Sequence, residues 1–467
     1  MESYSEDLKN LAFTIWDYSE LKFHELKSSQ AQIEVLQKYG FAVTKNVAGI
    51  ETAFTASFGN DSGPQIGYLG EFDALSGLSQ VADCPERMER EKGGCGHGCG
   101  HHLLGTASIG AAIQLKAYME ANNVDGRVIY FGCPGEEGGS GKAFMAKYGV
   151  FDGLDLALTW HPFNENAIFV GSMLANKQVY VRFKGVGSHA AATPHLGRSA
   201  LDALEILHIG INFLREHMRS IERIHYAITD SGGVSPNVVQ PYAEGIYLIR
   251  SDTTENVSRL YERFEKIVQG AALMTETQAE IVFDKACSNV VPNTVLERVL
   301  YESFKKLGCA EYTAEEKAYA KQFRDQYPDD NIYSEQILSL VADPQAEIRY
   351  LKDHLLYERI APYAPSNAVG MGSSDVGDVS NVVPTSQIIT ACFAIGTVGH
   401  SWQEVAQGKS SIALKGMFKA ADVLADAGKT LLNNPALIAE AKQELAQRQQ
   451  HKGFVSPIPD GAMPRIR

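Results

Sequence analysis

A cysteine and a histidine two positions apart stand in the glycine-rich segment GGCGHGCGHH, at Cys99 and His101. Thiolate and imidazole are ligands that Zn²⁺ and other borderline divalent cations bind well, and Gly100 between them relieves steric crowding. The pattern therefore indicates a metal site. Two alternatives stay open at this point. One is a flexible loop with incidental ligands, and the other is a small structural zinc site that also uses Cys95 and His97.

A pair of adjacent carboxylates, Glu136 and Glu137, follows the apolar run VIYFGCPG. Neighbouring side chains in a loop can face different ways, so one can bind a metal while the other acts as a base. Hydrolysis by metal-activated water requires both roles. The alternative is an acidic surface turn, which the preceding apolar run and the surrounding glycines disfavour.

Two further histidines stand close to the ends of apolar runs. His161 follows LALTW, and His400 follows IITACFAIG after a short loop. Each alone could be a buried structural histidine. Because sites in open α/β sheets form beyond the carboxyl ends of the strands, a common site explains all of these residues together.

The elements that would position these residues alternate in type along the chain. The helix-like ranges are 5–39, 103–120, 141–150, 199–218 and 255–274; the strand-like ranges are 54–59, 66–69, 126–132, 154–162, 176–187, 221–229, 244–252, 279–288 and 385–396. Short apolar runs separated by helices indicate an α/β fold with a doubly wound, mostly parallel sheet.

The order of elements changes in the middle of the chain. Between 176 and 291 it is strand–helix–strand–strand–helix–strand, the order of a ferredoxin-like α+β domain. We expect this domain to be inserted into a catalytic domain made of 1–175 and 292–467. The polar stretch 311–365 receives no structural assignment.

Composition excludes several classes of protein. The net charge of −14, from 42 basic and 56 acidic residues, disfavours a nucleic-acid or anionic-membrane partner. No run approaches the roughly 20 apolar residues that span a bilayer, and the start lacks a signal-peptide pattern. The odd count of seven cysteines favours reduced thiols in a cytoplasmic protein.

Taken together, the motifs GEFDAL, HGCGHH, CPGEEGGSGK, WHP and the late GH resemble the co-catalytic two-metal aminoacylase/carboxypeptidase superfamily. The likeness is to its amidohydrolase branch, which contains indoleacetyl-amino-acid hydrolases and bacterial aminobenzoyl-glutamate hydrolases. It extends over nearly the whole chain and is weakest at 311–365. It implies a zinc-exopeptidase-like catalytic domain with an inserted lid that commonly forms a dimer.

The resemblance also implies roles for the individual residues. It places Cys99 as a bridging ligand of two divalent ions, zinc or manganese; His101 and His161 complete one metal, and Glu137 and His400 the other. Glu136 matches the general base. Where many relatives have a histidine in an HxD motif, this chain has Glu71-Phe72-Asp73. Asp73 is therefore expected to orient a ligand, and the role of Glu71 is left open.

The inserted domain carries three further candidates. His189, in GVGSHAAATPH, matches a histidine that contacts the scissile carbonyl, often from the partner subunit; His195 is the weaker match. Asn237 and Arg250 match positions that hold the substrate, and an arginine can bind a carboxylate through two parallel hydrogen bonds. The alternative for each histidine is an exposed strand end, and for Arg250 an edge-strand surface charge.

These residues predict a metal-dependent amidohydrolase that cleaves an N-acyl amino acid, with Glu136 as general base of the metal-activated water. The resemblance favours an aminobenzoyl-glutamate-like substrate. A dipeptidase, a general N-acyl-amino-acid deacylase and a non-catalytic partner subunit are the alternatives. We expect a homodimer, or a heterodimer with a related subunit.

Overall fold

The structure is a computed structural model that describes residues 2–328 and 343–466. Within these ranges the main sheet has seven strands. In spatial order they are β1 (Ala42–Lys45), β2 (Phe54–Gly59), β4 (Arg127–Gly132), β3 (Gln65–Gly70), β5 (Leu156–Phe163), β15 (Thr385–Ala391) and β6 (Ala167–Ile168). The four strands from β4 to β15 are parallel, and the outer ones pair antiparallel. The carboxyl ends of the parallel strands therefore meet at one edge.

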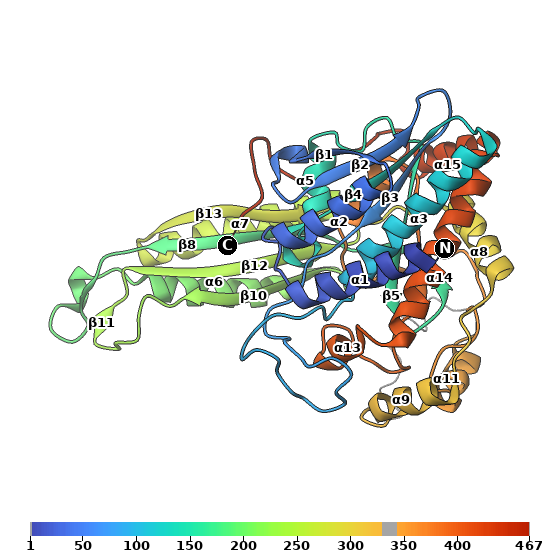
Figure 1. Ribbon diagram of the computed structural model, residues 1–467. Coiled ribbons are helices and arrows are strands. Elements are labelled where there is room, and N and C mark those ends of the chain that lie inside the picture. Colours follow the sequence, from blue (N-terminus) through green and yellow to red (C-terminus); the bar gives the residue numbers. More distant parts are fainter. Residues whose placement is uncertain (1, 329–342, 467) are drawn as a thin grey trace.

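Helices cover both faces of this sheet (Figure 1). One face packs against α1 (Glu2–Tyr18), α2 (Leu26–Lys38), α3 (His101–Asn122), α8 (Thr294–Leu307), α14 (Ser411–Leu432) and α15 (Pro435–Arg448). The other packs against α5 (Gly141–Lys147) and α12 (Val376–Val382). The α3 sequence LLGTASIGAA is small and apolar on all sides, which explains why it lies buried between the sheet and its neighbours. The doubly wound prediction is confirmed.

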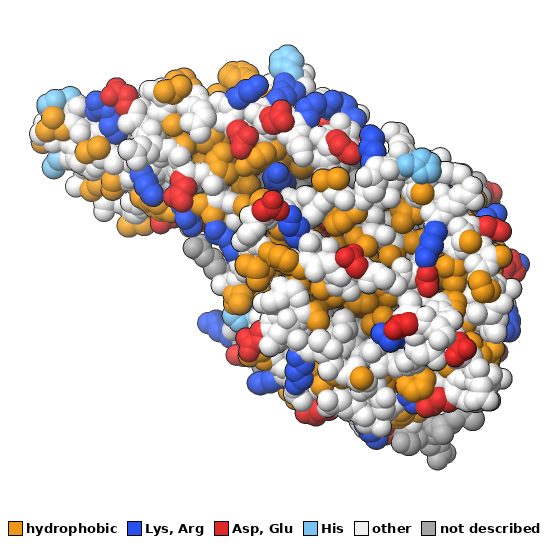
Figure 2. All heavy atoms as spheres, turned by 90° about the horizontal axis from the view of Figure 1, so that it is seen from above, with side chains coloured by type: hydrophobic (Ala, Val, Ile, Leu, Met, Phe, Trp, Pro, Cys, Tyr) orange, Lys and Arg blue, Asp and Glu red, His pale blue; other side chains and the backbone are white. Residues whose placement is uncertain are grey.

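The segment from β8 (Ala175–Lys184) to β13 (Gln278–Cys287) forms a second sheet with its own apolar core. Its strand order is β10 (Arg223–Asp230), β12 (Tyr242–Ser251), β8 and β13, all antiparallel. Helices α6 (Ala200–Arg215) and α7 (Thr254–Thr275) pack on one face. This is the predicted ferredoxin-like arrangement. It projects from the body as a long arm, which Figures 1 and 2 both show.

Short elements complete the chain. At the end of the arm, β9 (Ser188–His189) pairs with β11 (Val238–Val239), next to the single-turn η2 (Pro194–Leu196). Near the body, β7 (Ser172–Met173) pairs with β14 (Val369–Gly370). The remaining helices are α9 (Ala314–Arg324), α11 (Pro344–Asp353) and α13 (Trp402–Gln407), with the single turn η1 (Val47–Gly49). The short α4 (Glu136–Gly139) follows β4 at the carboxyl edge of the main sheet. Across the described ranges, no helix is long and apolar enough to cross a bilayer.

Two sequence expectations need refinement. The amphipathic range 5–39 is two helices, because Ser19 and Phe23 take positive φ and turn the chain between α1 and α2. The range 311–365, left without assignment, contains α9 and α11, while its middle lies outside the described residues. The capping box of α9, in which the side chains of Thr313 and Glu316 bond each other's backbone N–H, was the signal available in the sequence.

Candidate metal centre and active site

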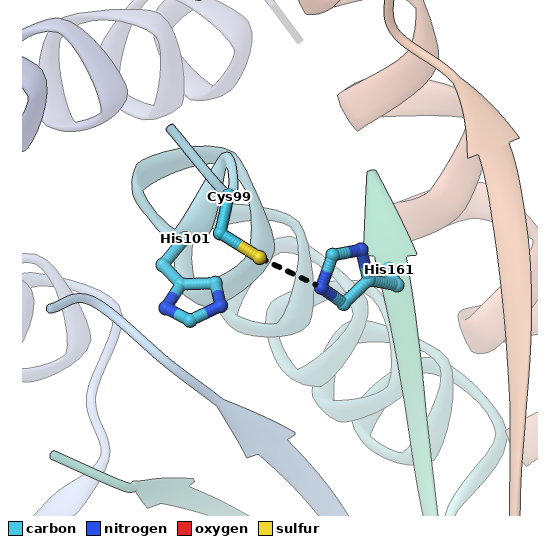
Figure 3. Close-up of side chains that lie close together, drawn as sticks. All are labelled: Cys99, His101 and His161. Carbon is cyan, nitrogen blue, oxygen red and sulfur yellow. Dashed lines mark hydrogen bonds between the residues drawn. The ribbon is translucent and has the colours of Figure 1, made fainter. Parts of the chain in front are cut away.

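All five predicted ligands lie together at the carboxyl edge of the parallel strands. Two triads, Cys99–His101–His161 and Cys99–Glu137–His400, each have ligand atoms within 4.8 Å of one another. Cys99 belongs to both. Figure 3 shows Cys99 and His101 at the start of α3 pointing toward His161 on β5, with Cys99 Sγ 3.4 Å from His161 Nε2. The predicted convergence on Cys99 is therefore present in the structure.

Backbone geometry fixes the two loops that carry these ligands. Gly100 has φ +68°, and a Cβ there would lie 2.6 Å from the Pro162 side chain, so only glycine lets the α3 start approach β5 this closely. His400 itself takes φ +58°, and its N–H donates to the Gly98 carbonyl at 2.7 Å. A non-glycine residue in the left-handed region is uncommon and is often held there by function.

The adjacent carboxylates face different partners, as expected. Glu137 Oε1 lies 3.3 Å from His400 Nε2, and the Glu137 N–H donates to Asp73 Oδ2 at 2.8 Å. Burial opposes ionisation of Glu137, but contact with His400 and the charge of His101 lower its pKa to about 2. Glu136 has the opposite environment. Burial, then the charges of Glu71 and Asp375, raise its pKa well above the ordinary value.

Asp73 orients His101. The Nδ1 atom of His101 lies 2.9 Å from Asp73 Oδ1, which leaves Nε2 directed to the other side of the ring, 3.1 Å from Glu71 Oε2. A carboxylate on one imidazole nitrogen fixes the tautomer that offers the other nitrogen to a metal. Glu71 also forms a third close group with His101 and Glu136. Its side chain, left open by the sequence, thus belongs to the site.

A buried ion-pair network that the sequence did not predict supports Glu71. Lys142, on α5, has no solvent exposure, and its Nζ lies 2.6 Å from both Glu71 Oε1 and Asp375 Oδ1. Burial opposes its charge, but Asp375 and Glu71 raise its pKa well above the ordinary value. The only available signal was the lysine that ends CPGEEGGSGK. Glu404, likewise unpredicted, is buried near Glu137, and burial raises its pKa.

The donor set fits divalent metal ions. His101 Nε2 and Glu137 Oε1 are buried and make no hydrogen bond of normal geometry. Burial, then the charge of Glu137, raises the pKa of the Cys99 thiol well above its usual range. Thiol, imidazole and carboxylate atoms gathered in this way stabilise a cation and are unfavourable without one. The alternative zinc knuckle is not formed: His97 Nε2 bonds the Ile15 carbonyl, and neither it nor Cys95 belongs to a close ligand group among the residues described.

An apolar cavity of about 390 Å³ opens beside the ligands. Cys99, Glu136, Glu137, His161 and His400 lie on its wall, so the ligand cluster faces it directly. The remaining wall is mostly apolar and includes Trp160, Phe163, Ile168, Phe169, Val170, Met173 and Ile389. Its size and lining are those of a site for a small organic molecule.

The residues of the inserted domain divide into two places. Arg250, on β12, reaches the body, where its Nη1 lies 3.4 Å from the Met371 carbonyl and 3.5 Å from Ser373 Oγ, beside the cavity wall. His189 and Asn237 lie together on β9 and next to β11, at the end of the arm. Figure 1 shows that end far from β5 and α3 of the same chain. The structure therefore brings Arg250 to a residue of the cavity wall, Ser373, but leaves His189 and Asn237 at the end of the arm.

Comparison with known proteins agrees with this geometry. The peptidase dimerisation domain M20_dimer matches residues 176–275. The chain is 45% identical to one of the subunits of p-aminobenzoyl-glutamate hydrolase from Escherichia coli (strain K12), over 99% of this chain and 97% of the relative. The chain belongs to the M20 family of metallopeptidases and amidohydrolases. As an M20 protein it is a metal-dependent hydrolase of amide bonds.

Other M20 relatives are more distant. The Xaa-Arg dipeptidase of Mus musculus is 28% identical, over 98% of this chain and 93% of the relative. Among solved structures, a dinuclear metal-binding M20 peptidase of Bacillus subtilis aligns with a TM-score of 0.56 at 16% identity, covering 93% and 99% of the two chains. An aminohydrolase from Staphylococcus aureus aligns with a TM-score of 0.62 at 15% identity, covering 92% and 97%. These structural likenesses concern the fold alone.

Proposed function

We propose that this chain hydrolyses the amide bond of an N-acyl amino acid of the aroyl-glutamate type. The observation that carries the proposal is the sharing of Cys99 by two ligand triads that open, beside Glu136, on one apolar cavity. The relative that is 45% identical is named as a hydrolase of p-aminobenzoyl-glutamate. The cavity is wide enough for an aromatic acyl group, and its apolar wall suits one.

The five ligands would hold two divalent ions, zinc or manganese. His101 and His161 would bind one, Glu137 and His400 the other, and Cys99 would lie between them. When bound, such ions lower the pKa of water and polarise the amide carbonyl. The orientation of His101 by Asp73 is a property of the chain itself and would prepare the site for them.

Glu136 would move the proton. Its carboxyl lines the cavity next to the ligands and is close enough to Glu71 and His101 to form a group with them. As general base it would accept the proton of the attacking water, and as general acid it would return that proton to the leaving amine. The raised pKa favours the second, proton-donating step.

His189 and Asn237 would serve the site of a partner subunit. Both are exposed at the end of the arm, far from the ligands of their own chain. The arm is the segment matched by the dimerisation domain, and β10 pairs with a strand on one side only among the described strands. We propose a homodimer in which each arm reaches the partner's cavity. Because the E. coli relative is named as one subunit of its hydrolase, a heterodimer with a related subunit is the alternative.

Arg250 would bind the substrate's carboxylate. It is half-buried, its Nε makes no hydrogen bond, and its two contacts with the body are long. Burial lowers the pKa of Arg250, which means that its positive charge is disfavoured without a partner. A substrate carboxylate would supply the opposite charge and two hydrogen-bond acceptors. We also propose a cytoplasmic location, which the seven free cysteines support.

Hydrolysis assays on the purified chain, supplied with zinc or manganese, test the proposal. We expect 4-aminobenzoyl-glutamate and benzoyl-glutamate to be cleaved at higher kcat/KM than dipeptides with a C-terminal arginine. The reverse order would favour the dipeptidase alternative, suggested by the Xaa-Arg dipeptidase relative. Bound metal without hydrolysis of any of these compounds would favour a non-catalytic partner subunit.

A further inference from the structure

The cavity contains a carboxyl group that the ligand cluster does not use. Glu165 lies between β5 and β6, lines the cavity, and is only 6% exposed. It belongs to none of the close ligand groups found among residues 2–328 and 343–466. The charge that acts on it is that of Glu347, not that of a cluster carboxylate. Glu165 is therefore a separate polar feature of the cavity wall.

The side chains on either side of Glu165 hydrogen-bond to the backbone of other segments, whereas the Glu165 side chain does not. Asn164 donates to the Thr397 carbonyl at 3.0 Å, and Asn166 donates to the Tyr357 carbonyl at 2.8 Å and accepts from the Ala391 N–H at 2.9 Å. These bonds fix the turn on both sides of Glu165. The Glu165 side chain itself makes no hydrogen bond or ion pair within the described part of the chain.

A buried carboxyl without a partner is unfavourable unless something binds it. Burial, then the charge of Glu347, raises the pKa of Glu165 to about 8. Glu347 is bonded elsewhere: its two oxygens accept from Tyr357 and Arg359, each at 2.7 Å, and no hydrogen bond joins it to Glu165 among the described residues. In either protonation state Glu165, which lines the cavity, keeps an oxygen that can accept a hydrogen bond.

We propose that Glu165 is a specificity-determining residue that accepts a hydrogen bond from an aromatic amine on the acyl group of the substrate. The inference rests on the proposed function, since it assigns the acyl group to this cavity. The surrounding side chains, including Trp160, Phe163 and Phe169, offer apolar and aromatic surface to a ring. One acceptor in such a wall selects a ring with an N–H donor over the same ring without one.

The test compares two acyl-glutamates of matched shape. The 4-aminobenzoyl and 4-methylbenzoyl compounds differ in an amine that donates hydrogen bonds and a methyl group that does not. For the metal-loaded wild type we expect kcat/KM about 10- to 100-fold higher for the amino compound, the range that one unpaired buried group produces. Glu165→Leu should reverse the preference, because it removes the acceptor and supplies an apolar surface.

The control variant is Glu440→Gln, which removes an exposed carboxylate from α15 and should leave the preference unchanged. Binding of 4-aminobenzoate and 4-methylbenzoate, measured by calorimetry, provides a readout without turnover. If Glu165→Leu does not fold, two measurements on the wild type still test the proposal: the ratio of kcat/KM for the two acyl-glutamates and the difference in affinity for the two benzoates. Equal kcat/KM values and equal affinities in the wild type would overturn the role of Glu165 but not the hydrolase. Failure to cleave either compound would overturn both.

Discussion

At the level of single residues, Lys142 shows how much the site depends on buried charge. It lies between Glu71 and Asp375 without access to water. Lys142→Met would leave two buried carboxylates without their cation, and loss of one partner of a buried pair costs about 3–5 kcal/mol. We expect a markedly lower midpoint of thermal unfolding.

Lys147→Met is the matched control, because Lys147 lies on the same helix and pairs with the exposed Asp460. Its unfolding midpoint should stay close to that of the wild type. Equal midpoints for the two variants would contradict a stabilising role of the buried Lys142 ion pairs.

The metal ligands and Asp73, which orients one of them, were visible in the sequence, but the buried charges around them were not. Cys99, His101 and Glu137 lie in dense motifs, and His161 and His400 could be added because strand ends converge. Lys142 could be noticed only as the last residue of CPGEEGGSGK, and Glu165 lies in no such motif; a lone lysine or glutamate is normally exposed. Their burial follows from the packing of α5 against the sheet and from the turn after β5.

At the level of elements, Asp378 on α12 ties this helix to the end of β13. Its carboxylate accepts from the Ser288 N–H at 3.0 Å and from Ser288 Oγ at 2.8 Å. Burial is the main cause that raises the pKa of Asp378 to about 7. Between pH 4 and pH 7 the folded state therefore holds a proton that the unfolded state has lost, so this group's contribution to stability falls as pH rises.

Asp378→Asn cannot ionise and should remove this contribution. Relative to the variant, the wild type should lose stability steadily as pH rises across that window, by about 1 kcal/mol for each pH unit. Thermal or denaturant unfolding of both proteins at pH 5 and pH 8 measures the difference. A gap between the two proteins that does not change with pH would contradict the assignment.

Most elements could be predicted from patterning, because strand and helix periods differ and glycines mark their ends. The prediction missed the break between α1 and α2, which depends on positive φ at Ser19 and Phe23, residue types that rarely adopt it. It also ended the strand that carries His161 at Pro162, one residue before β5 ends at Phe163. That boundary is set by pairing with β15, a strand more than two hundred residues later.

At the level of the whole molecule, the distance of His189 from its own cluster predicts sites shared between subunits. We expect Glu136→Gln and His189→Ala each to inactivate the homodimer. When the two variants are co-refolded or co-expressed, the mixture should recover about a quarter of wild-type activity. Half of the dimers would then contain one chain of each variant, and each of these would have one intact site of two.

Figure 2 shows the arm projecting clear of the body, with histidine side chains at its free end, where His189 could reach a partner. His451→Ala, an exposed histidine on the body, is the control for the His189 variant and should keep full activity. No recovery in mixtures whose heterodimer is confirmed by mass spectrometry would contradict action across the dimer.

We propose above all that Glu136 moves the proton for an amide hydrolysis supported by metals on the neighbouring ligands. The most direct test measures bound metal and 4-aminobenzoyl-glutamate hydrolysis in the same preparations of wild type and Glu136→Gln. We expect equal metal content, two ions per chain, with kcat lowered by about 10²- to 10⁴-fold in the variant. A Glu136→Gln protein that holds its metals and keeps wild-type turnover would contradict it.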